Sequence, residues 1–166
     1  MTSSSGALPV RRAARVLLVD PDDRLLLFRS RHEVTGGAFW YPVGGQVEAG
    51  ESFEAAVVRE AFEETGLAHL SLGPEVFRRR FIFRFRGVVW DAYERWWLAR
   101  VDTFAPQFGG MEALESGEFA DCRWMSAADL TTVAAAGDHL TPATLLSYLP
   151  RLLTGELTGA PYEVGD

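Results

Sequence analysis

Three glutamates near the middle of the chain have the type and spacing needed to bind a cation. Glu60 and Glu64 are four residues apart, and Glu63 lies three residues after Glu60. A helix turns by about 100° per residue, so it would place all three carboxylates within an arc of about 100°. Like charges so placed repel one another unless a cation lies between them, and Mg²⁺ prefers such oxygen ligands. The spacing suggests a Mg²⁺ site, and a solvated acidic face is the alternative.

The segment that carries these glutamates has the features of a helix. Residues 52–65 contain neither Gly nor Pro, Ser52 is a suitable N-cap, and Gly66 stands where a left-handed C-cap would end the helix. We therefore predict a helix over residues 52–65. At helical spacing its apolar residues fall opposite the acids, so we expect that face to be buried and the acidic face to be presented outward. The apolar residues are Ala55, Val58, Ala61 and Phe62.

The glutamates belong to a longer pattern with fixed spacing. It reads Gly45, five residues, Glu51, seven residues, Arg59-Glu60-Ala61, one residue, Glu63-Glu64, one residue, and Gly66-Leu67. This pattern resembles the signature of the Nudix hydrolases, and every fixed position is filled. Ala61 is small for an aliphatic position, and Pro42 is displaced from its commonest place, but neither departure removes a ligand.

The resemblance implies roles for the residues of the motif. Glu60 and Glu64 correspond to the principal metal ligands, and Glu63 to a further ligand or a general base. Glu51 corresponds to a supporting acid, and Arg59 to the residue that orients the acids. The implied ion is Mg²⁺, with Mn²⁺ as the alternative. The glycine pair Gly44 and Gly45 is expected to lie on the substrate side of the motif.

Other candidate residues lie outside the motif. The family often takes a general base from a loop, and Glu118 is the best match here, ahead of Glu112 and Glu115. Arg29 stands where Nudix proteins commonly carry a phosphate-binding cation. Trp40 could stack on a nucleobase, and packing in the core is the alternative.

The resemblance implies a Mg²⁺-dependent hydrolase that cleaves a diphosphate bond in a nucleoside di- or triphosphate derivative. Metal ions would polarise the phosphoryl oxygens and activate a water molecule for in-line attack on phosphorus. A nucleotide sensor on the same fold, which binds without hydrolysis, is the second hypothesis. Isomerisation of a prenyl diphosphate is disfavoured, because that chemistry uses a cysteine early in the domain and Cys122, the single cysteine, follows the motif.

The order of predicted elements agrees with the family fold, an α/β/α sandwich with a mixed sheet. Apolar runs separated by turn residues predict the strands, and the period-two pattern of residues 81–85 indicates one half of a hairpin. We expect strands at residues 14–19, 25–28, 39–41, 81–85, 88–101 and 119–125. Residues 44–45 should form a glycine loop, residues 102–117 a long loop, and residues 126–136 and 142–153 two further helices.

Length and charge limit the remaining possibilities. A chain of 166 residues fits one domain, which we place at residues 11–158, with tails at residues 1–10 and 159–166. The net charge of −7 argues against a protein that grips a nucleic-acid polymer. No apolar window is long enough for a membrane helix, so we expect a cytoplasmic protein with a small nucleotide-type substrate. A homodimer is an expected assembly, since many members of the family are dimers.

Overall fold

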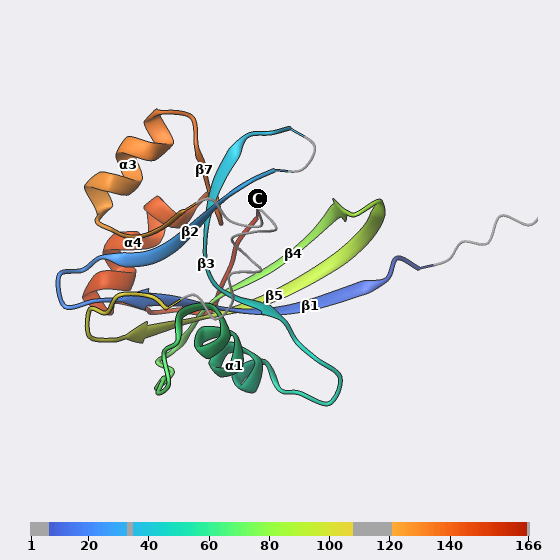
Figure 1. The fold of residues 1–166 in the computed structure, drawn as a ribbon, viewed down its shortest axis with the longest axis horizontal. Coiled ribbons are helices and arrows are strands. Elements are labelled where there is room, and N and C mark those ends of the chain that lie inside the picture. Colours follow the sequence, from blue (N-terminus) through green and yellow to red (C-terminus); the bar gives the residue numbers. More distant parts are fainter. Residues whose placement is uncertain (1–6, 33–34, 108–120, 166) are drawn as a thin grey trace, which may run out of the picture.

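A mixed β-sheet of eight strands forms the centre of the protein (Figure 1). The computed structural model describes residues 7–32, 35–107 and 121–165. Its strands are β1 (Val10–Val19), β2 (Leu25–Arg31), β3 (Ala38–Gln46), β4 (Glu75–Phe85), β5 (Val88–Arg100), β6 (Asp121–Met125), β7 (His139–Leu140) and β8 (Tyr162–Glu163). Its helices are α1 (Phe53–Thr65), α3 (Ala127–Ala135) and α4 (Leu145–Thr154). The strands predicted from the sequence are all present, the last of them from residue 121 onward.

The strand order is β6-β2-β3-β1-β5-β4-β8, and β7 pairs with β3. Strands β1 and β5 are parallel, with Val10 opposite Asp91 and Val19 opposite Arg100. The β7 and β8 pairings are also parallel, whereas β1 and β3 run antiparallel. Because β1 lies between β3 and β5, a side chain on β1 can contact residues of both neighbours.

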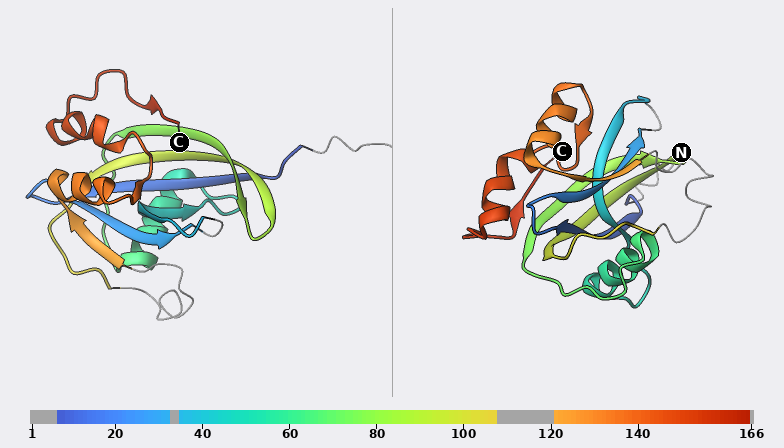
Figure 2. Two further views of the ribbon diagram at one scale, coloured as in Figure 1. Left: turned by 90° about the horizontal axis from the view of Figure 1, so that it is seen from above. Right: turned by 60° about the vertical axis from the view of Figure 1, so that its left-hand side comes forward.

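The sheet separates two hydrophobic layers. Helix α1 covers one face, and α3 and α4 cover the other (Figures 1 and 2). Alternate residues of β1 enter the two layers, so Leu17 packs with α4 residues and Val16 packs with α1 residues. This arrangement confirms the predicted α/β/α sandwich.

Helix α1 has the predicted ends, but its buried face is turned about the helix axis relative to the prediction. The Ser52 hydroxyl accepts a hydrogen bond from the Ala55 N–H (3.1 Å), and Gly66 closes the helix at φ 76°. Val58 and Phe62, however, are 39% and 57% exposed. The prediction that these two residues and Ala55 lie on the buried face was wrong, whereas Ala61 is buried as predicted. Five residues form the side of the helix that faces the sheet. These are Phe53, Ala56, Val57, Ala61 and Thr65.

Three other segments differ from the prediction. Gly44 and Gly45 continue strand β3 instead of forming a loop. The last helix begins at Leu145 and not at Pro142, because the preceding residue, Thr141, still donates its N–H to Trp40 O (2.9 Å). The expected C-terminal tail contains β8, which pairs with β4. Within the described residues, no helix is long and apolar enough to cross a membrane.

Candidate active site

Glu60 and Glu64 lie where α1 approaches the glycine pair of β3. The Gly44 N–H donates a hydrogen bond to Glu64 Oε2 (2.9 Å). A Cβ atom on Gly45 would lie 2.5 Å from the carboxyl carbon of Glu60. At Gly44, φ is 139°, and a side chain there would collide with the Ala14 carbonyl of β1. Gly45 is therefore needed for Glu60 to reach the sheet, and Gly44 is needed for β3 to approach the backbone of β1.

Arg59 joins the other acids of the motif. Its Nε and Nη2 atoms donate to the two carboxylate oxygens of Glu51 (2.9 and 3.1 Å), and Nη2 also donates to Gln46 O (3.0 Å). Its Nη1 atom donates to Glu60 Oε1 (2.9 Å) and Glu63 Oε2 (3.0 Å). One guanidinium thus contacts three acids and a backbone carbonyl, as an orienting role requires.

Burial dominates the electrostatics of the two inner carboxylates. It raises the pKa of Glu64 to about 7, although the Gly44 N–H and the charge of Arg15 act in the opposite direction. Burial also raises the pKa of Glu60, while Arg59 favours its charged form. Two desolvated acids that also repel each other are unfavourable without a cation, and a divalent ion would favour the ionised form of both.

The donor set fits a Mg²⁺ ion held by few protein ligands. Along the described parts of the chain, no three acidic, cysteine or histidine side chains are gathered closely enough to enclose an ion. The side chain of Glu63 is 53% exposed, so Glu60 and Glu64 are the inner pair of carboxylates. Mg²⁺ is commonly bound through one or two carboxylates plus water and substrate phosphates. The pair provides that number of ligands.

Two of the remaining predicted site residues, Arg29 and Trp40, share a partner in Asp138. The guanidinium of Arg29 is paired with Asp138, from Nε to Oδ2 (2.9 Å) and from Nη2 to Oδ1 (3.3 Å). Trp40 is only 1% exposed, and its Nε1 donates to Asp138 Oδ2 (2.9 Å). Trp40 is thus a core residue, so its ring has no free face for a nucleobase. Glu118 lies outside the described residues, as do Glu112 and Glu115.

The sequence reasoning missed a charged group on the sheet face opposite α1. Arg15 of β1 donates from Nη1 to Gly44 O (2.8 Å), and its Nε lies 3.5 Å from Glu94 Oε1. Glu94 of β5 is buried and is also bonded to Arg79 of β4. The sequence does show a charged residue among the apolar residues of both strands, Arg15 in β1 and Glu94 in β5. That the two side chains meet depends on the register of the strands, which the sequence alone did not give.

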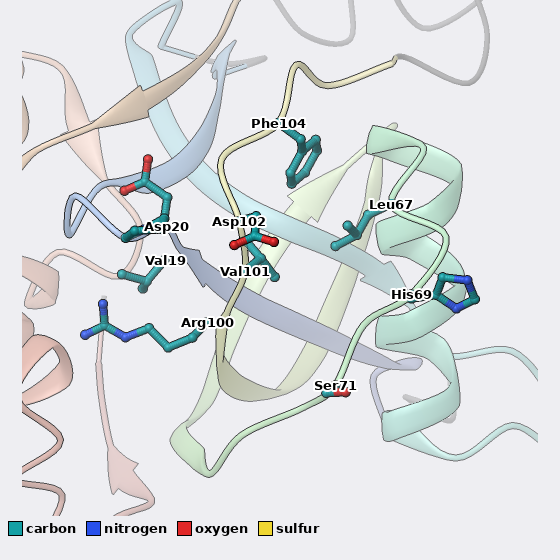
Figure 3. Close-up of a pocket in the computed structure, with 10 residues that line it drawn as sticks. Val19, Asp20, Leu67, His69, Ser71, Arg100, Val101, Asp102 and Phe104 are labelled. Atoms are coloured by element: carbon teal, nitrogen blue, oxygen red, sulfur yellow. The ribbon is translucent and has the colours of Figure 1, made fainter.

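One cavity lies away from the glutamates of the motif. It has a volume of about 500 Å³ and lies where β1 and β5 end beside the segment that follows α1 (Figure 3). Asp20 borders it, but this buried carboxylate already accepts hydrogen bonds from Arg24 Nε (2.9 Å) and Thr103 Oγ1 (3.0 Å). None of the motif glutamates lines the cavity. The cavity is therefore separate from the candidate metal ligands.

Sequence comparisons connect the chain to known proteins. Residues 9–146 match the NUDIX domain family. The chain is 38% identical over 65 residues to a prenyl-diphosphate phosphatase from Methanosarcina mazei, which covers 36% of this chain and 35% of that protein. It is 46% identical over 50 residues to an ADP-ribose pyrophosphatase from Methanocaldococcus jannaschii, which covers 30% of this chain and 29% of that protein. The matches thus span about a third of each relative.

A structural comparison extends the likeness to most of the fold. The crystal structure of a MutT protein from Methanosarcina mazei aligns with a TM-score of 0.61. The alignment covers 92% of this chain and 99% of that chain, at 20% sequence identity. At this identity the likeness shows a shared fold, and the chemistry has to be argued from the site.

Proposed function

Because this chain belongs to the NUDIX domain family, we propose that it is a Mg²⁺-dependent hydrolase that cleaves a diphosphate bond in a nucleotide-type substrate. The observation that carries the proposal is the pair of carboxylates, Glu60 and Glu64, gathered against Gly44 and Gly45. Their burial is unfavourable in the free protein and suits a site that receives a cation. Mn²⁺ is the alternative ion.

The residues of the site divide the work. Glu60 and Glu64 would hold the divalent ion, with Glu63 as a further ligand or base. When bound, the ion supplies positive charge that polarises the phosphoryl oxygens and acidifies water. Arg59 fixes Glu60 and Glu63 by hydrogen bonds, and Glu51 in turn holds two donors of Arg59. This second layer of contacts keeps the acids oriented before substrate binds.

The reaction consumes one water molecule. Its oxygen forms a bond to one phosphorus, the bridging P–O bond breaks, and the leaving phosphate takes the electron pair. The proton of the water passes to a base. The side chain of Glu63 is 53% exposed, and its only polar contacts among the described residues are with Arg59, so it can accept this proton. Glu118 remains the other candidate base.

The proposed reaction limits the substrate to compounds that contain a diphosphate bond, and the fold alone does not narrow this class further. Curated relatives include a prenyl-diphosphate phosphatase and an ADP-ribose pyrophosphatase, which are named for different diphosphate compounds. We propose a nucleotide in which a diphosphate joins a nucleoside to a second group, or a nucleoside triphosphate. Nucleic-acid polymers are not expected, given the net charge of −7.

A substrate panel tests the proposal. The protein is incubated with ADP-ribose, a dinucleoside polyphosphate, nucleoside triphosphates and a prenyl diphosphate, each with Mg²⁺ and with EDTA. Chromatography should show two phosphorylated products, or a monophosphate and pyrophosphate, from at least one compound and only with the metal. Binding of a nucleotide without metal-dependent turnover of any compound would instead favour the sensor.

Isomerase chemistry is not supported at Cys122. Burial raises the pKa of this thiol to about 12, and the negative charge of Asp121 adds to the effect. The thiol therefore stays protonated at neutral pH, whereas a reactive cysteine needs a stabilised thiolate. We interpret Cys122 as a packing residue on β6.

A further inference from the structure

Arg15 contacts the backbone that supports the acidic pair. Its Nη1 atom donates to the Gly44 carbonyl (2.8 Å), while the N–H of the same glycine donates to Glu64 (2.9 Å). Gly44 has a φ of 139°, and glycine is the residue with the greatest conformational freedom. Within the paired strands β1 and β3, the Gly44 carbonyl is thus bonded to the side chain of Arg15 and its N–H to the side chain of Glu64.

Arg15 is itself held in place by a buried partner. Glu94 is 4% exposed, and its Oε1 lies 3.5 Å from Arg15 Nε. The other oxygen of Glu94 accepts hydrogen bonds from Arg79 Nε and Trp96 Nε1, both at 3.1 Å. A buried ion pair adds little net stability, because both charges lose their hydration. Glu94, which Arg79 and Trp96 hold in place, can instead fix the orientation of the Arg15 side chain.

The peptide group that Arg15 contacts also lies beside Glu60. The Gly44 carbonyl belongs to the peptide that joins Gly44 to Gly45, and the Glu60 carboxylate lies against Gly45. The Gly44 N–H that bonds Glu64 belongs to the preceding peptide, and the two peptides meet at the Gly44 Cα. A rotation of the Gly44–Gly45 peptide would move Gly45 relative to Glu60 and change the backbone angles of Gly44 beside Glu64. One guanidinium on the far face of the sheet is therefore linked to both inner carboxylates.

We propose that Arg15 is a positioning residue, which holds the Gly44–Gly45 peptide so that Glu60 and Glu64 keep the arrangement that binds the divalent ion. The inference rests on the proposed function. Arg15 acts here through the backbone of β3 and does not need to touch the substrate. Glu94 serves as its anchor.

The substitution Arg15→Met tests the inference, because the loss of positioning and the loss of a positive charge should change the affinity for a divalent ion in opposite directions. Removing a positive charge beside a cation site should tighten metal binding by Coulomb attraction alone. Loss of positioning should weaken it, and outer contacts of this kind are worth about 10- to 100-fold in metal affinity or activity. We expect calorimetric titration with Mn²⁺ to show at least tenfold weaker binding than wild type. Unchanged or tighter binding by the folded variant would overturn the proposal.

Kinetics separate positioning from direct substrate contact. With a compound that the enzyme hydrolyses, Arg15→Met should lower kcat about tenfold and leave KM within about twofold, and Arg15→Lys should recover part of the loss. A raised KM with unchanged kcat would mean that Arg15 binds substrate and would contradict the inference. Arg12→Met is the matched control, since Arg12 is a neighbour on β1 whose guanidinium stacks on Phe53 (4.5 Å). It should keep wild-type values.

The two measurements also distinguish this inference from the proposed function. If no diphosphate in the panel is hydrolysed but Arg15→Met weakens Mn²⁺ binding, the proposed hydrolysis fails and the positioning role stands. If hydrolysis is found but the variant binds Mn²⁺ as wild type does, the positioning role fails alone. Thermal unfolding of each variant shows whether the metal titrations compare folded proteins.

Discussion

At the scale of single residues, the direction of Glu60 and Glu64 decides what they can do. Helical periodicity correctly predicted that their carboxylates lie together, because the angle between positions depends only on their spacing. It could not predict which side of α1 faces the sheet. Val58 and Phe62 are exposed, and the two glutamates point inward. Only the neighbouring strand explains this, since Gly45 leaves the space that Glu60 occupies and the Gly44 N–H bonds Glu64.

Gly45→Ala tests that close approach. The new methyl group would lie 2.5 Å from the carboxyl carbon of Glu60, which is the end of a flexible side chain and can move aside. We expect the fold to remain and Glu60 to be displaced, with metal-dependent turnover reduced by about tenfold or more. Gly165→Ala is the control, because nothing lies within 4 Å of a methyl group there. Wild-type turnover in Gly45→Ala would show that the contact is not needed.

At the scale of secondary structure, local signals predicted the ends of α1 well. Ser52 caps the helix by accepting the Ala55 N–H, and Gly66 adopts the left-handed conformation at its end. The last helix was less accurately predicted, because a proline that is compatible with a helix start was instead part of the turn before it. The glycine pair was mistaken for a loop, since glycine signals both turns and close backbone contacts.

Ser52→Ala measures the contribution of the cap. Loss of the side-chain acceptor leaves the Ala55 N–H without its partner, and such substitutions cost about 1 kcal/mol of unfolding free energy. Urea unfolding at constant pH provides the value. Ser147→Ala, inside α4, is the matched control and should leave the stability within about 0.5 kcal/mol of wild type. Equal effects of the two substitutions would exclude a specific capping role.

At the scale of the whole molecule, long-range pairings determine the site and escape prediction from one sequence. Arg29 is paired with Asp138, which is 109 positions away in the sequence, and its expected contact with phosphate stays a prediction. Arg15 and Glu94 meet because β1 and β5 are parallel neighbours, an arrangement that no local pattern specifies. The layers of the fold, by contrast, could be predicted from apolar runs and from the resemblance of the motif.

Glu75 of β4 accepts hydrogen bonds from Arg95 of β5 and so links the two strands. This contact should make the free energy of unfolding depend on pH in the acid range. Hydrogen bonds from Arg95, and then from Arg78, lower its pKa from 4.5 to about 2. A carboxylate with a lowered pKa stabilises the fold above its unfolded pKa, and the contribution is lost as the pH falls through the folded value. The stabilisation should therefore be complete above about pH 5.5 and disappear towards about pH 2.

Glu75→Gln measures this contribution. We expect the variant to be less stable than wild type by on the order of 2 kcal/mol at pH 7, with the difference shrinking as the pH is lowered to about 2.5. Urea unfolding at several pH values gives the comparison, and Glu156→Gln, at an exposed residue, serves as the reference. A difference that stays constant with pH would rule out the ion pairs as its cause.

The central claim is that Glu64 and Glu60 bind the divalent ion that diphosphate cleavage requires. The most direct measurement is the dependence of turnover on Mg²⁺ concentration for wild type, Glu64→Gln and Glu54→Gln, using the best compound of the panel. Glu54 lies in the first turn of the same helix with its side chain 51% exposed, so its variant should match wild type. Glu64→Gln should lose at least about 100-fold in turnover and need more Mg²⁺. Wild-type turnover and Mg²⁺ dependence in Glu64→Gln would contradict the account.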